Sequence, residues 1–328
     1  MQLTDRQALQ RGYISREEQL VHQQEIALCQ CDGRTLHCHQ VALPSGLAAT
    51  MIWDRCMDIS RLSYHGIPLY YLGRNDERDD ISPVFEQRFS GGMLYTCGLL
   101  NVGPGDCEQP THGRIHLHSA TMRSIRREGD TLVLQGQMRE STLFGENLLL
   151  ERKLIFPLYK SEVHLSDTIT NQTPRPQPYM LLYHINLGYP LLSEWLTLHF
   201  PEGTQTFPAN EHAGKHLHQL AECTAPQIDF QEQDFLHKLP GMDGYCKLTG
   251  ENSALGIGFG LQYRLDTLPY LNQWRCLRSG DYVLGLEPAN NHVNGRIEAK
   301  RDNTLPHLAP FASVTTEVTL TFFDLPCA

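Results

Sequence analysis

Short hydrophobic segments recur along most of the chain, and each is bounded by a cluster of Gly, Pro, Asn or Asp. In residues 162–169, apolar and polar side chains alternate with a period of two, which is typical of a β-strand with one buried face. Strands at this density, with turn residues between them, indicate an all-β sandwich. The other clear expected strands are residues 48–53, 131–136, 255–259 and 313–323.

The N-terminal residues have a different pattern. Ser15 and Glu18 have the spacing of a capping box, in which two side chains and two backbone amides bond reciprocally at the start of a helix. We therefore expect two parts. Residues 1–27 form an N-terminal helical extension, which either caps the sandwich or makes a dimer contact. Residues 28–328 form the β-sandwich domain.

The composition narrows the range of functions. The chain has 328 residues, 41% of them hydrophobic, and large sandwiches of this size fold as one domain. Its formal net charge is -10, from 37 acidic and 27 basic residues without a basic stripe, so we expect no nucleic-acid partner. No apolar run approaches the length of about 18 residues that a membrane span needs. The first residues are charged where a signal peptide is apolar, so we expect a cytoplasmic protein without membrane partners.

The chain has ten cysteines but no Cys-x-x-Cys pair. In a cytoplasmic protein, cysteines are normally reduced and mostly buried. Two clusters contain residue types that bind metals, but the first has the wrong spacing for zinc and the second has the composition of a solvated surface. We expect no metal and no cofactor, and the sequence alone leaves both clusters open. The clusters are Cys29, Cys31 and Cys38, and His212, His216 and His218.

One acidic residue ends a buried segment. Residues 282–286 form an apolar run that predicts a buried strand, and Glu287 and Pro288 follow directly. Proline cannot donate a hydrogen bond to a sheet, so the strand should end near Pro288. A carboxylate at the mouth of a buried strand must find a partner or raise its pKa. Glu287 is therefore either paired with a structural base or part of a functional site.

A second expected strand carries His184 and Asn186. Residues 180–187 are otherwise apolar or aromatic, and these two polar side chains alternate, so they should point to the same face. A single histidine on an apolar strand is more often a satisfied core residue than a catalyst. A histidine and an asparagine together on one face favour a polar cavity.

Two further stretches contain candidate ligand-binding groups. Arg88 precedes a pair of glycines among apolar residues, where its head group either reaches water or binds a ligand. In residues 112–118, three histidines and Arg114 alternate, so they share one face if this stretch is a strand. Of the three histidines, His112 lies next to a glycine and is the strongest functional candidate.

Five short motifs in this order resemble the aldose 1-epimerases, the galactose-mutarotase-like superfamily, and in particular its divergent aldose 1-epimerase-like branch. Each motif is modest alone, but five in order are fairly specific. The resemblance covers roughly residues 40–325, and it implies a large galactose-mutarotase-like β-sandwich with a sugar held on one concave sheet. The motifs are residues 55–59, 91–99, 112–115, 184–191 and 285–290.

The resemblance also implies roles for individual residues. The base of the family falls on Glu287 and its general acid on His184. A histidine that contacts the sugar falls on His112, and a substrate-binding arginine falls on Arg88. The aspartate of the family's Gly-Tyr-Asp stretch has no secure counterpart, because residues 243–245 contain these letters in another order. We include two further residues among the candidate substrate-binding groups, namely Asn186 and Arg114.

These residues predict an aldose 1-epimerase, or mutarotase, that interconverts the α and β anomers of a free aldose. A base takes the proton of the C1 hydroxyl group while an acid protonates the ring oxygen, and the ring opens, rotates and closes again. One carboxylate and one imidazole suffice for this chemistry. The expected partner is a small monosaccharide, with a pentose as one candidate, and the expected assembly is a monomer or homodimer.

Two alternatives stay open. An epimerase for sugar phosphates would need a second cationic group near the mouth of the site, such as Arg114 or Arg55. A non-catalytic carbohydrate-binding protein on the same fold would need aromatic residues such as Trp274, which we otherwise assign to the core. It would not need Glu287 and His184 together. A separation of more than about 10 Å between these two would favour the binding protein, because both must reach one sugar ring.

Overall fold

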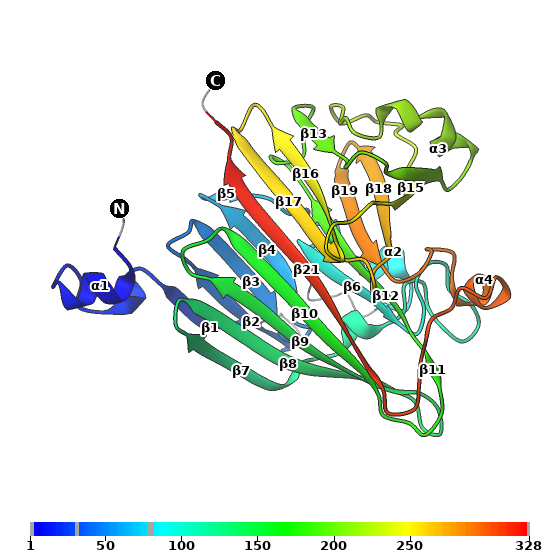
Figure 1. The fold of residues 1–328 in the computed structure, drawn as a ribbon, viewed down its shortest axis with the longest axis horizontal. Helices are drawn as coiled ribbons and strands as arrows, with labels where there is room; N and C mark the ends of the chain where they lie inside the picture. The colour runs from blue at the N-terminus through cyan, green and yellow to red at the C-terminus, as the bar shows by residue number, and fades with distance from the viewer. Residues whose placement is uncertain (1–2, 30–32, 78–81, 327–328) are drawn as a thin grey trace.

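The structure, a computed structural model, describes residues 3–29, 33–77 and 82–326. Antiparallel strands provide most of the regular structure, which confirms the all-β fold (Figure 1). The strands are β1 (His22–Cys29), β2 (Thr35–Ala42), β3 (Leu47–Ile52), β4 (Asp58–Tyr64), β5 (Ile67–Pro68), β6 (Leu94–Leu99), β7 (Thr121–Glu128), β8 (Thr131–Ser141), β9 (Asn147–Pro157), β10 (Glu162–Asn171), β11 (Gln177–Pro178), β12 (Met180–Leu187), β13 (Leu196–His199), β14 (Gln205–Pro208), β15 (Gln233–Lys238), β16 (Tyr245–Asn252), β17 (Ile257–Arg264), β18 (Tyr270–Arg278), β19 (Asp281–Ala289), β20 (His307–Leu308) and β21 (Ser313–Asp324).

The helices of the described part are all short, and none of them has the length and apolar character needed to cross a membrane. The α-helices are α1 (Asp5–Gln10), α2 (Phe85–Arg88), α3 (Glu211–Lys215) and α4 (Arg296–Arg301). The 3-10 helices are η1 (Glu17–Gln19), η2 (Ile115–Leu117) and η3 (Leu217–Gln219).

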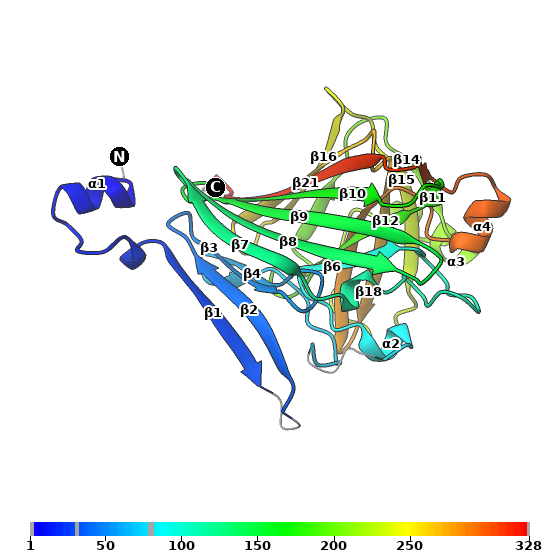
Figure 2. The same ribbon diagram turned by 90° about the horizontal axis from the view of Figure 1, so that it is seen from below.

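The described strands form three large sheets and one small one. The first sheet has the order β1-β2-β3-β4-β5, the second β13-β16-β17-β21-β10-β9-β8-β7, and the third β14-β15-β18-β19-β12-β6. A short pair, β11 and β20, joins the segments that lead into the second and third sheets. The ribbon of β1 and β2 projects from the body of the molecule (Figure 2).

The hydrophobic core lies between the sheets and includes the large side chains Trp53, Phe156 and Tyr263. Strand β10 alternates strictly between buried and half-buried residues, as its sequence pattern predicts. Strand β12, in contrast, is buried along its whole length. One face of β12 packs into this core, and the other faces a pocket described below.

A buried ionic network links all three large sheets. The Arg152 guanidinium on β9 donates to both carboxylate oxygens of Asp167 on β10, at 2.9 and 2.7 Å, and also to Asp58 on β4. It also donates to the Thr96 hydroxyl on β6 at 2.9 Å, and the Tyr183 hydroxyl on β12 donates to Asp167 at 2.8 Å. Such a network is stable only when each buried charge has its partners, so it fixes these five strands relative to one another.

The N-terminal prediction is partly wrong. An α-helix is present, but it covers only Asp5–Gln10, and its capping box is formed by Thr4 and Gln7. The helical interpretation fails beyond η1, because residues 22–27 belong to strand β1. The physical reason is that apolar side chains near the end of β1 alternate and pack against β2 and β3, which a helix would not allow.

Helix α1 is attached to the end of the sandwich. Asp5 is fully buried and accepts hydrogen bonds from Arg127 on β7 and from the Tyr159 hydroxyl. The hydrogen bond from Arg127 lowers the pKa of Asp5 to about 2. These contacts attach the N-terminal segment to one end of the sandwich, and the two roles expected for it stay open.

The Arg152 network gives a stability prediction. Replacing Arg152 with Met leaves the buried carboxylates of Asp58 and Asp167 without their cation. We expect the free energy of unfolding, measured by urea denaturation, to fall by about 3–5 kcal/mol. The matched control is Arg139→Met on the exposed face of β8, which should change it by less than about 0.5 kcal/mol. A loss below about 1 kcal/mol in Arg152→Met would show that the network does not support the fold.

Candidate active site

A large pocket of about 960 Å³ opens on one face of the six-stranded sheet. Strands β12, β15, β18 and β19 provide its floor and one wall, and the segments around residues 71–75, 85–89 and 103–112 provide the other walls. This volume lies at the upper end of the range for small-molecule sites. The pocket contains both apolar and titratable side chains, as expected for a site that orients a polar ligand.

Glu287 and His184 meet on the floor of this pocket. They lie on the neighbouring strands β19 and β12, and the His184 Nε2 atom is 3.0 Å from the Glu287 Oε1 atom. Both residues are almost fully buried, with 1% and 5% of their surface exposed. Gly285 makes this approach feasible, because a Cβ atom at that position would lie 2.5 Å from Oε1 of Glu287.

The second carboxylate oxygen of Glu287 has a neutral partner. Asn272 lies directly opposite Glu287 on β18, and its amide donates to Oε2 at 2.7 Å. Oε1 of Glu287 accepts no hydrogen bond of normal geometry from the described residues, although the imidazole lies beside it. The Oε1 atom is buried and has hydrogen-bonding capacity that no described residue uses.

Burial sets the protonation of the pair. It raises the pKa of Glu287 to about 8, against an opposing effect of the Asn272 hydrogen bond. Burial, together with a smaller effect of nearby His112, lowers the pKa of His184 to about 3. Both shifts disfavour a net charge, so the pair holds one proton across the neutral range. A pair with one proton always offers one donor and one acceptor.

His112 also faces the pocket, close to the pair. Its ring centre lies 6.4 Å from that of His184 and 4.7 Å from that of Phe85. Burial and the Arg88 charge lower the pKa of His112 to about 4, so it is a neutral hydrogen-bonding group at neutral pH. The following residue, Gly113, has a φ of 68°, and a Cβ there would lie 2.2 Å from the Gly98 carbonyl oxygen. The close approach of these two backbones positions His112.

Arg88 does not reach the pocket. Its side chain is buried, and its guanidinium donates to the carbonyl oxygens of Thr111 and Gly113, at 2.7 Å each, and of Pro83 at 3.0 Å. The expected direct contact of Arg88 with a sugar is therefore not supported. The arginine instead holds the two residues that flank His112, so it acts through the position of that loop.

Two other candidates also lie outside the pocket lining. The Asn186 amide donates to the backbone carbonyls of Gly92, at 2.9 Å, and His184, at 3.1 Å. Its side chain lies next to the His184 ring and raises the pKa of that histidine. Asn186 therefore affects His184 without lining the pocket. Arg114 forms an ion pair with buried Glu140 at 2.7 Å, away from the pocket. The structure thus does not bring Asn186 or Arg114 into contact with a ligand in this pocket.

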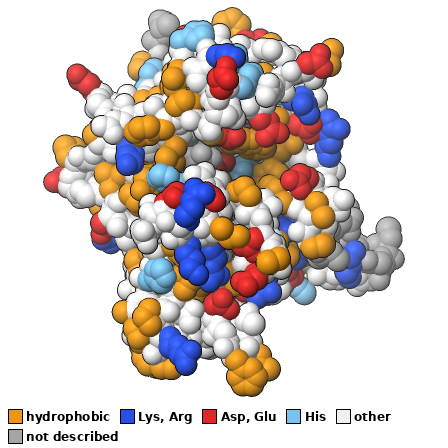
Figure 3. All heavy atoms as spheres, turned by 90° about the vertical axis from the view of Figure 1, so that its right-hand side faces the viewer, with side chains coloured by type: hydrophobic (Ala, Val, Ile, Leu, Met, Phe, Trp, Pro, Cys, Tyr) orange, Lys and Arg blue, Asp and Glu red, His pale blue; other side chains and the backbone are white. Residues whose placement is uncertain are grey.

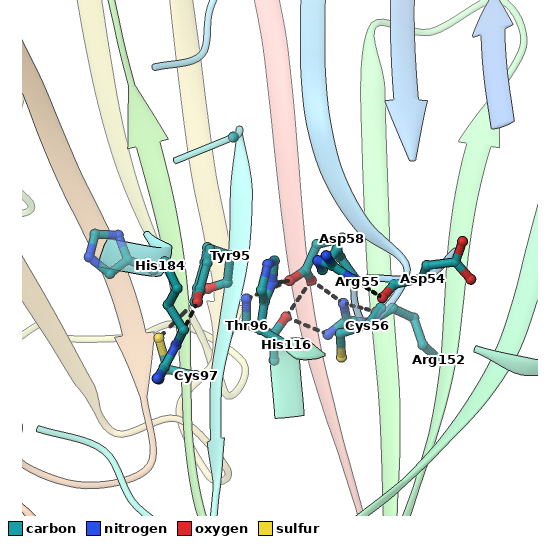
Figure 4. Close-up of polar contacts among 12 residues, drawn as sticks. Asp54, Arg55, Cys56, Asp58, Tyr95, Thr96, Cys97, His116, Arg152 and His184 are labelled. Carbon is teal, nitrogen blue, oxygen red and sulfur yellow. Dashed lines mark hydrogen bonds and ion pairs between the residues drawn. The ribbon is translucent and has the colours of Figure 1, made fainter. Parts of the chain in front are cut away.

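Residues 112–118 do not form a strand, which was the condition for their histidines to share one face. Residues Ile115–Leu117 form the 3-10 helix η2, so the histidines do not share one face. His116 points into the core, where its Nδ1 atom lies 2.8 Å from Asp58 (Figure 4). Its ring stacks on Tyr95 with 3.6 Å between the ring centres.

Several pocket residues were not predicted as site residues, among them Trp274 and Asp234. Trp274 lines the pocket instead of the core, and its ring centre lies 5.4 Å from that of His184. Asp234 lies on β15, and burial raises its pKa to about 6. Strand β15 is not evident from the sequence because residues 206–240 are mostly polar. In the structure, Gln233–Lys238 alternates between buried and more exposed positions.

No group of three or more His, Cys, Asp or Glu residues in the described part of the chain is placed to hold a metal ion. In the histidine cluster, the ring centres of His212 and His216 lie 4.6 Å apart, and none of the described residues completes a metal site with them. Of the cysteine cluster, Cys29 is exposed and Cys38 is buried, while Cys31 lies outside the described residues.

Comparison with solved structures identifies the fold. A candidate aldose 1-epimerase from Klebsiella pneumoniae subsp. pneumoniae MGH 78578 matches with a TM-score of 0.81 at 19% identity, covering 93% of this chain and 88% of that one. A galactose mutarotase-like protein from Clostridium acetobutylicum has a TM-score of 0.70 at 13% identity, covering 94% and 100%. Galactose 1-epimerase from Lactobacillus acidophilus NCFM has a TM-score of 0.65 at 12% identity, covering 93% and 99%.

At these identities the likeness shows the fold alone, and the chain has the aldose 1-epimerase, or galactose-mutarotase-like, fold. The family is shown by sequence. The chain belongs to the family described as Domain of unknown function (DUF4432), whose model matches residues 33–322. No curated protein matches the chain in sequence.

The buried pair gives a prediction for stability against pH. In the unfolded chain Glu287 loses its proton near its ordinary value, whereas in the folded protein it keeps the proton up to about pH 8. As the pH rises from about 4.5 to about 8, the free energy of unfolding of the wild type should therefore fall relative to that of Glu287→Gln, which has no titrating group at this position. Measured by urea unfolding, the free energy of unfolding of Glu287→Gln minus that of the wild type should increase by about 1–3 kcal/mol from pH 5 to pH 8.

Glu202→Gln, at an exposed carboxyl group in a loop, is the matched control and should follow the wild type at both pH values. An equal stability difference between Glu287→Gln and the wild type at pH 5 and pH 8 would contradict the raised pKa of Glu287.

Proposed function

We propose that the protein is an aldose 1-epimerase that interconverts the anomers of a free aldose by acid–base catalysis. The observation that carries this proposal is the 3.0 Å approach of the His184 imidazole and the Glu287 carboxyl group on the floor of a large pocket. The separation is far below the roughly 10 Å beyond which the two groups could not reach one sugar ring.

The proposed reaction uses the single proton of the pair. The step starts from the arrangement in which the shared proton lies on His184 and Glu287 is ionised, which the pKa values make the less populated of the two arrangements. From it, Glu287 takes the proton of the C1 hydroxyl group while His184 gives its proton to the ring oxygen, and the C1–O bond of the ring breaks. After the carbonyl end rotates, the two transfers run in reverse. The product is the other anomer, and the pair returns to its starting state. Each group acts as acid and as base in turn. A pair that holds one proton, with one pKa above and one below neutral pH, can do both.

Other pocket residues are suited to bind the sugar. Asn272 keeps the Glu287 carboxyl group oriented through its hydrogen bond. Neutral His112 and the carboxyl group of Asp234 are suited to bind sugar hydroxyl groups. Trp274 offers an apolar surface for the C–H face of a sugar ring, and its indole N–H is held by Glu232 at 3.1 Å.

A non-catalytic sugar-binding protein is the less favoured function. Burying a carboxyl group and an imidazole together works against the stability of the fold, and simple binding does not require it. Groups with strongly shifted pKa values that meet in a pocket favour catalysis. For the sugar-phosphate alternative, neither of the two expected cations, Arg114 and Arg55, lines the pocket, so another cation would have to bind the phosphate.

A direct test is exchange spectroscopy by NMR on neutral pentoses, hexoses and deoxysugars. The wild type should accelerate anomer exchange of at least one of them. Glu287→Gln should lower the rate constant by about 10²–10⁴-fold, because the base is lost while its shape is kept. Circular dichroism should show an intact fold for this variant.

Glu251→Gln, at an exposed carboxyl group on β16 in another sheet, is the control and should exchange at the wild-type rate. Full activity of Glu287→Gln, or no acceleration by the wild type of any aldose, neutral or charged, would contradict the proposed function.

A further inference from the structure

The wall of the pocket formed by β15 carries a cation without an ionic partner. Asp234, Leu236 and Lys238 alternate along this strand and all line the pocket. Asp234 lies toward one end of the strand and Lys238 toward the other, so the wall changes from acidic to basic along its length. Among the described residues, no carboxylate forms an ion pair with Lys238; its interactions are with two aromatic rings.

Two aromatic rings hold the ammonium group of Lys238 in place. Its Nζ atom lies 5.9 Å from the ring centre of Phe207 on β14 and 5.6 Å from that of Tyr270 on β18. Both distances are within the range of cation–π attraction. The charge is therefore positioned at the edge of the pocket before any ligand arrives, and it still has hydrogen-bond donors to offer.

A second nitrogen next to this charge lacks a partner. His292 lines the pocket, and its ring packs edge-on against Tyr270 with 4.6 Å between the ring centres. Its Nε2 atom is buried and has no hydrogen bond with the described residues. Lys238 and His292 both contact the Tyr270 ring, and burial, together with a smaller effect of the Lys238 charge, lowers the pKa of His292. A buried polar atom without a partner calls for an explanation, and a bound ligand is one.

The position of this site relative to the reacting pair follows from the strand register. Asn272 pairs with Glu287, and Tyr270, two residues earlier on the same strand, lies beside Lys238. Lys238 is thus two strands across and two residues along from Glu287, about 12 Å between Cα atoms at normal sheet spacings. The four-carbon stem of lysine spans part of this distance. A monosaccharide with a charged substituent on its last carbon fits the remainder.

The other basic end of the pocket is far from the reacting pair. There Arg74 pairs with Asp281 at 2.8 Å, and Arg278 lies opposite Asp281 in the register of β18 and β19. Asp281 is six residues from Glu287 on β19, about 20 Å along the strand at normal spacing. The face of the molecule near α3 and α4 shows acidic, basic and hydrophobic side chains interspersed, without a broad basic field (Figure 3). Selectivity for an anion would therefore come from a local site and not from the overall charge.

We propose that the substrate is an aldose carrying an anionic group, a phosphate or a carboxylate, on the carbon farthest from the anomeric centre, and that Lys238 and His292 bind this group. The inference rests on the proposed function for the reaction itself. It adds the chemical class of the substrate and two specificity-determining residues, neither of which follows from the reacting pair.

The test compares anomer exchange of neutral hexoses with that of their 6-phosphates and of the corresponding hexuronates. In the wild type, kcat/KM for one charged series should exceed that for the neutral sugars by about tenfold or more. The series that gains identifies the anion as phosphate or carboxylate. Lys238→Met should lower this selectivity roughly tenfold, mainly through KM, whereas Lys238→Arg should retain most of it.

Lys247→Met, at an exposed lysine on β16 outside the pocket, is the matched control and should keep the wild-type selectivity. Equal kcat/KM values for neutral and charged sugars in the wild type would overturn the proposal. Unchanged selectivity in Lys238→Met would overturn it as well.

A binding experiment separates failure of this proposal from failure of the proposed function. Calorimetry with a hexose 6-phosphate and a hexuronate needs no catalysis. If no sugar shows accelerated exchange, tighter binding of one of these probes to the wild type than to Lys238→Met would still support the anion site. Equal binding to both proteins would overturn it.

Discussion

The buried guanidinium of Arg152 is the interaction on which the arrangement of the sheets depends. It lies in an apolar core and is compensated by Asp58 and Asp167, which belong to two different sheets. A buried cation with two carboxylates tolerates little displacement, because every lost contact leaves a desolvated charge. The strands that carry these groups must therefore stay in one relative position.

This constraint extends to the candidate active site. Thr96 and Tyr183 are paired residues on β6 and β12 whose side chains bind the network. The adjacent pair in the register is Tyr95 and His184, whose side chains lie on the opposite face of the two strands, and of these two His184 lines the pocket (Figure 4). The core network thus lies directly behind the strand that presents His184. An imidazole that must meet a carboxyl group within hydrogen-bond distance benefits from such a rigid support.

The reacting pair itself works against stability. Burial raises the pKa of Glu287 and lowers that of His184, and the only hydrogen-bond donor to the carboxyl group in the described structure is the neutral amide of Asn272. A structural ion pair would normally be more exposed or more fully bonded. The chain even keeps a glycine at position 285, where any side chain would collide with the pair. These features are understandable if the pair is retained for proton transfer.

The sequence predicted the fold class and the floor of the pocket, because both depend on local pattern. Alternation revealed strands such as β10, and the apolar runs before Glu287 and around His184 revealed two buried strands with a polar residue each. The resemblance then related the two residues to each other. The partners of Arg88 could not be predicted, since they are backbone carbonyls of a loop that only the folded chain brings near.

The remaining wall of the pocket could not be predicted because its sequence is polar. Strand β15 has few apolar residues, so the hydrophobic pattern does not predict it, nor does it predict that Asp234 and Lys238 line the pocket. Arg114 has the residue type expected of a ligand-binding group, but its partner, Glu140, comes from a different strand and takes it out of the pocket. In each of these cases the residue type was informative, but its environment depended on contacts distant in sequence.

A double-variant kinetic cycle most directly tests whether Glu287 and His184 act as one proton-sharing unit. Anomer exchange of one aldose that the wild type accepts would be measured for the wild type, Glu287→Gln, His184→Asn and the double variant. If the two groups share one proton, the double variant should be no slower than the slower single variant, within about twofold, because either loss disables the unit. Losses that multiply in the double variant would show two independent groups and would contradict a shared-proton mechanism.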